Sequence, residues 1–301
     1  NGSGVNPSNS VAIGNQAGRY AEGNSNVALG QSALKGNNAG NFVGHSNIAI
    51  GYEAMDALEV GEEYNIAIGS GAIGAMQEGS AGGDVDHNIA IGLDAFKGGD
   101  LDTADNQVQG NIAIGSYALD ATGANAQTGT IAIGHSALSG LTSGIRNTAV
   151  GYQALSACNN NHYNTAVGWN ALYNYDLEHS NTAVGHEAMG GSGASSSCVA
   201  IGSQALDGAT TSAADGAVAI GVSSLGAVTS GGSNTACGYQ SGDTITTGSN
   251  NTMIGHNADV SDAGSTNRTA LGSGVTVGVN NAVVLGNNDV TDVYMAQDSG
   301  A

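Results

Sequence analysis

Four side chains in the middle of the chain have types and a spacing that suit contact with a sugar. Each follows a glycine, at intervals of seventeen residues, and they are His135, Tyr152, Trp169 and His186. Near them in the sequence lie His162, Tyr163, Tyr173 and Tyr175. Aromatic faces and imidazole rings suit carbohydrate rings, so we predict a column of glycan contacts made by the first four side chains together with Tyr173 and Tyr175.

The alternative for this column is a packing ladder along a repeated structure. The same position holds rings again at Tyr239 and His256. Elsewhere it holds polar or aliphatic residues, namely Asn15, Gln31, Ser70, Leu93, Ser116, Ser203 and Val222. Such variety also fits simple packing, so both interpretations stay open.

Metal chemistry has weaker support. Cys158, Cys198 and Cys237 show no CxxC or CxxH spacing, so no zinc site is predicted, and Cys237 is expected to be a small core residue. Two acidic clusters could hold Ca²⁺ in loops, although neither has the spacing of a DxDxDG loop. They are Asp84 with Asp86, and Asp100 with Asp102 and Asp105. We therefore expect no cofactor, with Ca²⁺ in the acidic loops as the open alternative.

Catalysis finds no motif. A glycosidase needs two carboxylates fixed across a cleft, but Glu53 and Glu187 lie far apart in the repeat series. No nucleophile elbow and no GxxxxGK[ST] phosphate loop is present in the sequence. We expect a protein that is not an enzyme.

The candidate residues belong to a repeated phrase. It reads NTAVGYQAL at 147–155, NTAVGWNAL at 164–172 and NTAVGHEAM at 181–189, and variants of it occur along the whole chain. A fixed period of this size is typical of a repeat architecture in which each unit packs on its neighbours.

Each phrase contains a short strand. The residue before its central alanine is Ile, Val or Thr in every copy, and such β-branched residues favour strands. Alternation places the two residues that flank the alanine on one face, and we expect that face to point into the coil. Ala149, Ala166 and Ala183 then face outward, where we interpret them as an interface between identical chains around a threefold axis. The alternative is a covering loop over the alanines.

The rest of the phrase predicts the corners of a coil. Gly after the strand permits a sharp turn, and the Ala-Leu pair that follows is expected to be a second buried segment. Asn opens most copies, and stacked Asn side chains could form an amide ladder at one corner.

Composition restricts the partners. Five basic residues against 25 acidic ones give a net charge of −20, which disfavours nucleic acid and anionic membranes. No apolar run approaches the length of a membrane-spanning helix. Strong negative charge suits a soluble surface outside the cell.

The phrase N-x-A-[IVL]-G resembles the head repeats of trimeric autotransporter adhesins. It is still more similar to NTAVGYQAL-type repeats in chaperone-processed bacteriophage tail fibres, and 286–296 looks like the segment that joins such repeats to the chaperone. The resemblance covers 10–296. It implies an all-β, left-handed parallel β-roll of about sixteen short coils, with three chains intertwined or side by side.

The expected organisation is a repeat array over 1–286 and a transition segment over 287–301. The resemblance implies an extracellular structural protein on a virion tail or cell surface. It would be the shaft or receptor-binding region of a homotrimeric fibre that attaches to a host glycan or protein receptor. The period is longer than in the adhesins, which favours the phage fibre. A bacterial adhesin head and a filament subunit that polymerises end to end remain alternatives.

Overall fold

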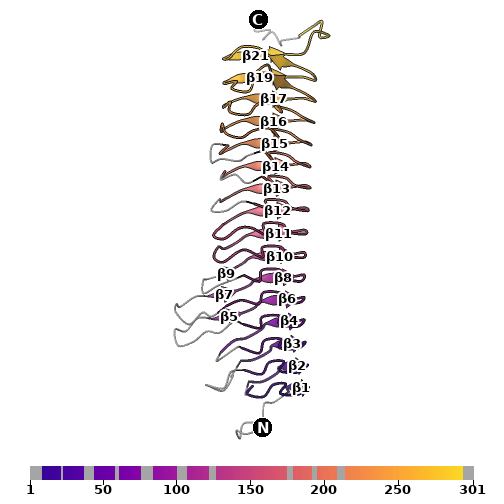
Figure 1. Ribbon diagram of the computed structural model, residues 1–301, viewed down its shortest axis with the longest axis vertical. Coiled ribbons are helices and arrows are strands. Elements are labelled where there is room, and N and C mark those ends of the chain that lie inside the picture. Colours follow the sequence, from indigo (N-terminus) through magenta and orange to yellow (C-terminus); the bar gives the residue numbers. More distant parts are fainter. Residues whose placement is uncertain are drawn as a thin grey trace, which may run out of the picture. The chain divides into compact units, whose positions relative to one another are not determined.

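The chain folds as a parallel β-solenoid, and the part that the structure describes contains strands and turns but no helix (Figure 1). The computed structural model describes residues 9–21, 23–36, 44–57, 61–75, 84–99, 107–121, 127–174, 179–191, 195–208 and 214–293. The prediction of an all-β parallel solenoid is therefore confirmed.

Most strands of the described residues join one 16-stranded sheet in sequence order. They are β1 (Val11–Ile13), β2 (Val27–Leu29), β3 (Ile48–Ile50), β4 (Ile66–Ile68), β6 (Ile89–Ile91), β8 (Ile112–Ile114), β10 (Ile131–Ile133), β11 (Thr148–Val150), β12 (Thr165–Val167), β13 (Thr182–Val184), β14 (Val199–Ile201), β15 (Val218–Ile220), β16 (Thr235–Cys237), β17 (Thr252–Ile254), β19 (Arg268–Leu271) and β21 (Ala282–Leu285). Two small sheets lie beside it. They are formed by β5 (Val85–Asp86), β7 (Val108–Gln109) and β9 (Gln127–Thr128), and by β18 (Asp259–Val260) and β20 (Thr276–Val277).

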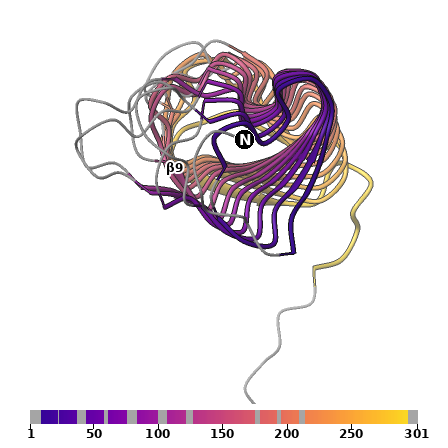
Figure 2. The ribbon, with the colours of Figure 1, turned by 90° about the horizontal axis from the view of Figure 1, so that it is seen from below.

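The chain divides into two compact units, residues 1–183 and 184–301. In the first unit, equivalent residues of neighbouring repeats pair in parallel, so that Ala149 lies opposite Ala166. Seen end on, the coils of this unit follow one another along the same path (Figure 2). In the second unit the pairing is equally regular, for example between β14 and β15. The side chain at each repeat position therefore forms a file along its unit.

The faces of the strands are the reverse of the sequence prediction. Ala149, Ala166 and Ala183 are fully buried within a single chain, whereas the flanking residues are half-buried or exposed. The prediction that these alanines form an interface between chains is therefore wrong. Alternation sets which residues share a face, and the narrow interior of the coil accepts only the small side chain of Ala on that face.

The second segment supplies the large side chains of the core. Its residues, such as Ala154 and Leu155, are fully buried, as the sequence predicts. The leucine has a φ of 53°, which is rare for a bulky residue. Burial of the side chain opposes this conformational cost, because a fully buried Leu contributes about 1.5–3 kcal/mol.

The asparagines form the predicted amide ladder at the corner where each strand begins. In the first unit, Asn164 N–H donates to Asn147 Oδ1 at 3.0 Å, and Asn181 N–H donates to Asn164 Oδ1 at 2.9 Å. In the second unit, Asn251 N–H donates to Asn234 Oδ1 at 3.0 Å. The left-handed residue at this corner is the one before Asn, for example Tyr163 with a φ of 61°. The Asn side chains are buried and satisfy backbone groups, so their role is structural.

The ladder of the second unit ends on a buried arginine. Arg268 takes the place of Asn, and its N–H donates to Asn251 Oδ1 at 3.0 Å. Its guanidinium donates to Val277 O at 2.7 Å and to Asp262 Oδ2 at 2.8 Å. These bonds explain how a charged side chain that is 4% exposed remains in the interior.

The ladder of the first unit is interrupted at Thr130. Its Oγ1 is buried and has no hydrogen-bond partner, although its N–H still donates to Asn111 Oδ1 at 2.9 Å. We predict that Thr130→Asn raises the free energy of unfolding by about 1 kcal/mol, because an amide can continue the ladder to the next coil. Urea unfolding followed by circular dichroism measures this. Thr148→Asn, on the outer face of β11, is the control, and equal effects of the two substitutions would contradict the prediction.

Candidate functional site

The predicted aromatic column exists in the first unit as a stack of rings. The ring centroids of His135 and Tyr152 lie 5.4 Å apart with planes inclined by 15°. Those of Tyr152 and Trp169 lie 6.3 Å apart with planes inclined by 8°. Tyr117 contacts His135 edge-on at 5.8 Å. The spacing of seventeen residues thus places successive rings one above another.

This stacking changes what the column can bind. The faces of the three parallel rings turn toward one another, while Tyr152 and Trp169 remain 45% and 43% exposed. A sugar that stacks on an aromatic ring needs an open face, and this column offers mainly ring edges and their polar atoms. The geometry favours the packing ladder, and the glycan role of the column stays a prediction.

The other predicted members lie in different settings. Tyr173 is half-buried, and Tyr175 lies outside the described residues. His186, in the second unit, is exposed, with its Nδ1 lying 3.6 Å from Glu187 Oε2. In the same unit Tyr239 and His256 form a stacked pair at 5.3 Å and 15°.

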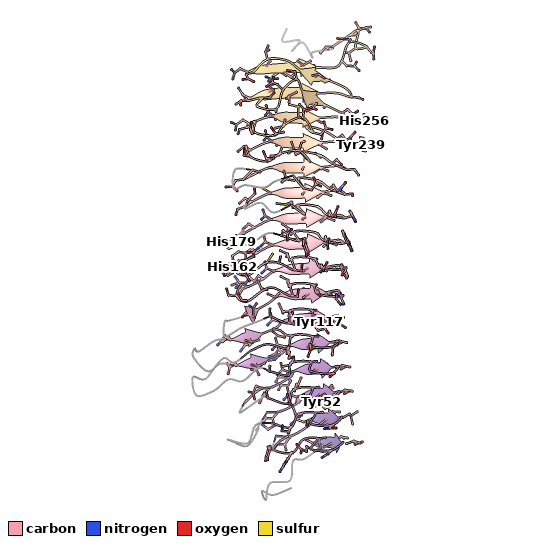
Figure 3. The ribbon with its side chains drawn as sticks, viewed as in Figure 1. Tyr52, Tyr117, His162, His179, Tyr239 and His256 are labelled. Atoms are coloured by element: carbon pink, nitrogen blue, oxygen red, sulfur yellow. The ribbon has the colours of Figure 1, made fainter. Side chains whose placement is uncertain are left out.

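His162 and Tyr163 lie at a different edge from the column. They precede β12, whereas Trp169 follows it, so the two groups flank opposite ends of the same strand. Figure 3 shows His162 and His179 at the edge where the strands begin, and it shows Tyr239 and His256 of the second unit beyond the arrowheads. His162 and Tyr163, which lie near the column in the sequence, are therefore not part of it.

A file of side-chain acceptors runs along the edge where the strands begin. The residue two before the ladder position accepts a hydrogen bond from the backbone N–H of the same position in the preceding coil. The bonds join Asn24 N to His45 Nδ1 (2.8 Å), Glu63 N to Asp86 Oδ1 (2.7 Å), Ile145 N to His162 Nδ1 (3.1 Å), His162 N to His179 Nδ1 (3.1 Å), Ser196 N to Asp215 Oδ1 (2.7 Å) and Thr266 N to Asn280 Oδ1 (3.0 Å). Sequence reasoning missed this file because its members are different residue types, His, Asp and Asn, which have in common only an acceptor atom at the δ1 position.

These bonds fix the tautomer of the histidines. An Nδ1 that accepts an N–H carries no proton, so the neutral ring holds its proton on Nε2. When a histidine binds a metal through Nε2, its Nδ1 carries the proton and donates a hydrogen bond, which is the reverse of the arrangement here. His45, His162 and His179 are therefore poor metal ligands in this arrangement.

The acidic clusters give no cation site in the described residues, where no group of three or more His, Cys, Asp and Glu is placed to hold a metal ion. Asp84 and Asp86 are described, whereas Asp100, Asp102 and Asp105 lie outside the described residues. Burial, followed by the nearby Glu53, raises the pKa of Asp56 to about 6. Burial likewise raises the pKa of Asp259 to about 6.

The cysteines occupy different environments. Cys237 lies at an outward position of β16 and is exposed, so the prediction that it is a core residue is wrong. Cys158 and Cys198 are buried and are not part of a disulfide. Cys198 takes the ladder position of Asn, and its Sγ donates to Ala214 O at 3.2 Å in place of an amide. Burial raises the pKa of the Cys198 thiol.

The described residues include no helix that is long and apolar enough to cross a membrane. Comparison with protein-family models gives no match, and comparison with curated proteins gives none either.

Proposed function

We propose that this chain is the shaft and receptor-binding region of an extracellular homotrimeric fibre, most closely a phage tail fibre that attaches to a host. In this proposal the array over 1–286 is a left-handed roll of about sixteen coils, and 287–301 is a transition segment. The protein extends as a shaft and recognises a receptor, and it does not act through catalysis. The fibre type and the number three rest on the resemblance of the repeats to trimeric fibres.

The observation that carries the proposal is the apolar outer face of the strands. In the first unit, β3, β6, β8 and β10 each place two isoleucines on this face, all of them half-buried. In the second unit, β14 and β15 place a valine and an isoleucine there, with Ile201 and Ile220 each 39% exposed. A sheet face in water normally carries polar side chains, and a continuous apolar file is typical of a surface covered by a partner.

Identical chains are the partners that fit this face best. The files are regular, with equivalent residues of neighbouring strands in register, and a second copy offers the same spacing and the same apolar chemistry. A bacterial adhesin head would use the face in the same way. A filament that grows end to end would instead leave it open to water.

The solution mass tests the assembly. We expect light scattering after size exclusion to give three times the chain mass of 29.4 kDa. Cys237 supplies a native probe, because its thiol is exposed on the outer face of β16 while Cys158 and Cys198 are buried. If copies pack on this face, a bulky maleimide should leave Cys237 of the native protein unlabelled, whereas in a monomer it should label one thiol per chain and Cys237→Ser should abolish that labelling. A monomeric mass would overturn the proposal of a trimeric fibre. A broad, very large mass would favour a filament that grows end to end.

A further inference from the structure

A cation and two rings meet at the strand-start edge of the first unit. The Cζ atom of Arg146 lies 5.9 Å from the ring centroid of Tyr163. The ring of His162 lies 6.0 Å from that of Tyr163. Arg146 comes from the corner before β11, and His162 with Tyr163 from the corner before β12, so adjacent coils supply them. We call these three residues the Arg146 corner.

The charge of Arg146 is unusual in a chain with a net charge of −20 and only five basic residues. Lys97 and Arg268 each lie within 3.3 Å of a carboxylate oxygen. Arg146 is exposed and lies against the Tyr163 ring, with no carboxylate oxygen of the described residues within 4.0 Å. Its guanidinium therefore remains available for a carboxylate from outside, which it can bind in a bidentate manner.

His162, whose ring contacts that of Tyr163, adds a neutral donor to this corner. Its Nδ1 accepts the N–H of Ile145 at 3.1 Å, which places the ring proton on Nε2. Burial, followed by the nearby His179, lowers the pKa of His162, which favours the neutral ring with Nε2–H as a donor. Tyr163 is 50% exposed and contributes a phenol hydroxyl and part of an aromatic ring.

We propose that the Arg146 corner binds a sugar that carries a carboxylate, such as a uronic acid residue of a host glycan. Arg146 holds the carboxylate, while His162 Nε2–H and the Tyr163 hydroxyl bond to sugar hydroxyls. The neutral donor and the phenol favour a sugar over an acidic peptide, because a peptide carboxylate brings no neighbouring hydroxyl groups for them. This inference rests on the attachment role proposed above and gives it a ligand class.

The test uses the full chain and calorimetric titration at pH 7.5 and low salt. Trigalacturonic acid is the probe, with neutral maltotriose and triglutamate as comparisons. We expect saturable binding of trigalacturonic acid alone. Arg146→Gln should weaken that binding about tenfold or more, as the loss of a charge-assisted pair implies. His162→Asn should weaken it severalfold while keeping the coil, because Asn280 Oδ1 accepts the N–H of Thr266, which is the equivalent backbone hydrogen bond of another coil.

Arg19→Gln is the matched control, since Arg19 also lies over a tyrosine, 5.1 Å from the Tyr20 ring, but at another coil. It should leave binding unchanged. Equal binding of maltotriose, unchanged binding by Arg146→Gln, or no binding at all would overturn the inference. Binding of triglutamate with equal affinity would indicate an acidic peptide as the ligand and would overturn the assignment of a sugar. A chain that forms trimers but binds none of the probes would contradict this inference and leave the fibre intact.

Discussion

Ala166→Glu is expected to unfold the coil that contains it, with a loss of about 4 kcal/mol or more, because a charged group enters the core without a partner. Ala166 is exposed neither to solvent nor to a neighbouring chain, because its own chain buries it completely. It lies opposite Ala149 in β11, so a longer side chain there also separates two strands. Thermal unfolding by circular dichroism and limited proteolysis would measure the effect.

The neighbouring substitution Val167→Glu is the matched control. Val167 is on the same strand but points outward and is 36% exposed. We expect it to leave the coil folded and to reduce the solution mass if copies pack on this face. If Val167→Glu unfolds the chain as strongly as Ala166→Glu, the assignment of the two faces is wrong. If Ala166→Glu stays folded, the buried role of the alanines is contradicted.

The reversal of the strand faces shows what the repeated phrase could and could not predict. The two-residue alternation correctly grouped the flanking residues on one face, but it contains no information on which face is inner. The Ala-Leu segment decides this point. Its leucine fills the interior opposite the strand, and beside a fully buried Leu172 only a small strand residue such as Ala166 has room.

One irregular pair in the second unit carried that information in the sequence. Gly242 takes the leucine position of the second segment, and Met253, on the strand of the next coil, takes the alanine position. A Cβ added to Gly242 would lie 3.4 Å from Met253 Cγ, and Met253 is fully buried. The large and small residues have exchanged places, which means that the two positions pack against each other.

The candidate sites were predicted to different degrees for similar reasons. A period of seventeen residues was enough to align His135, Tyr152 and Trp169, because one coil follows another in register. It could not predict that the rings would cover one another's faces, since this depends on side-chain torsions. The Arg146 corner joins residues of adjacent coils at the opposite edge, and no shared residue type marks it in the sequence.

Gly151→Ala is expected to lower the free energy of unfolding by about 3 kcal/mol or more, for two independent reasons. The φ of Gly151 is 140°, a conformation that residues with a Cβ rarely adopt. An added Cβ would also lie 2.3 Å from the carbonyl oxygen of Gly168 in the next coil. That oxygen is a backbone atom of the next coil and cannot turn aside as a side chain could, so the two coils must move apart to relieve the clash. Urea unfolding measured for the variant and the native chain gives the difference.

Gly129→Asn tests whether a glycine is required because two coils approach closely or only because its φ is positive. Gly129 has a φ of 64°, and the nearest atom that its Cβ would meet is Arg146 Cγ at 3.8 Å. The same corner is held by Arg146 and Tyr163 with φ values of 58° and 61°, so side chains adopt this conformation in neighbouring coils. We expect a change within about 0.5 kcal/mol, because Asn tolerates the left-handed region. A large loss from Gly129→Asn together with a small one from Gly151→Ala would contradict the argument. The expected order instead means that the glycine after each strand is required by the distance between coils, which makes it the position least tolerant of change in the repeat.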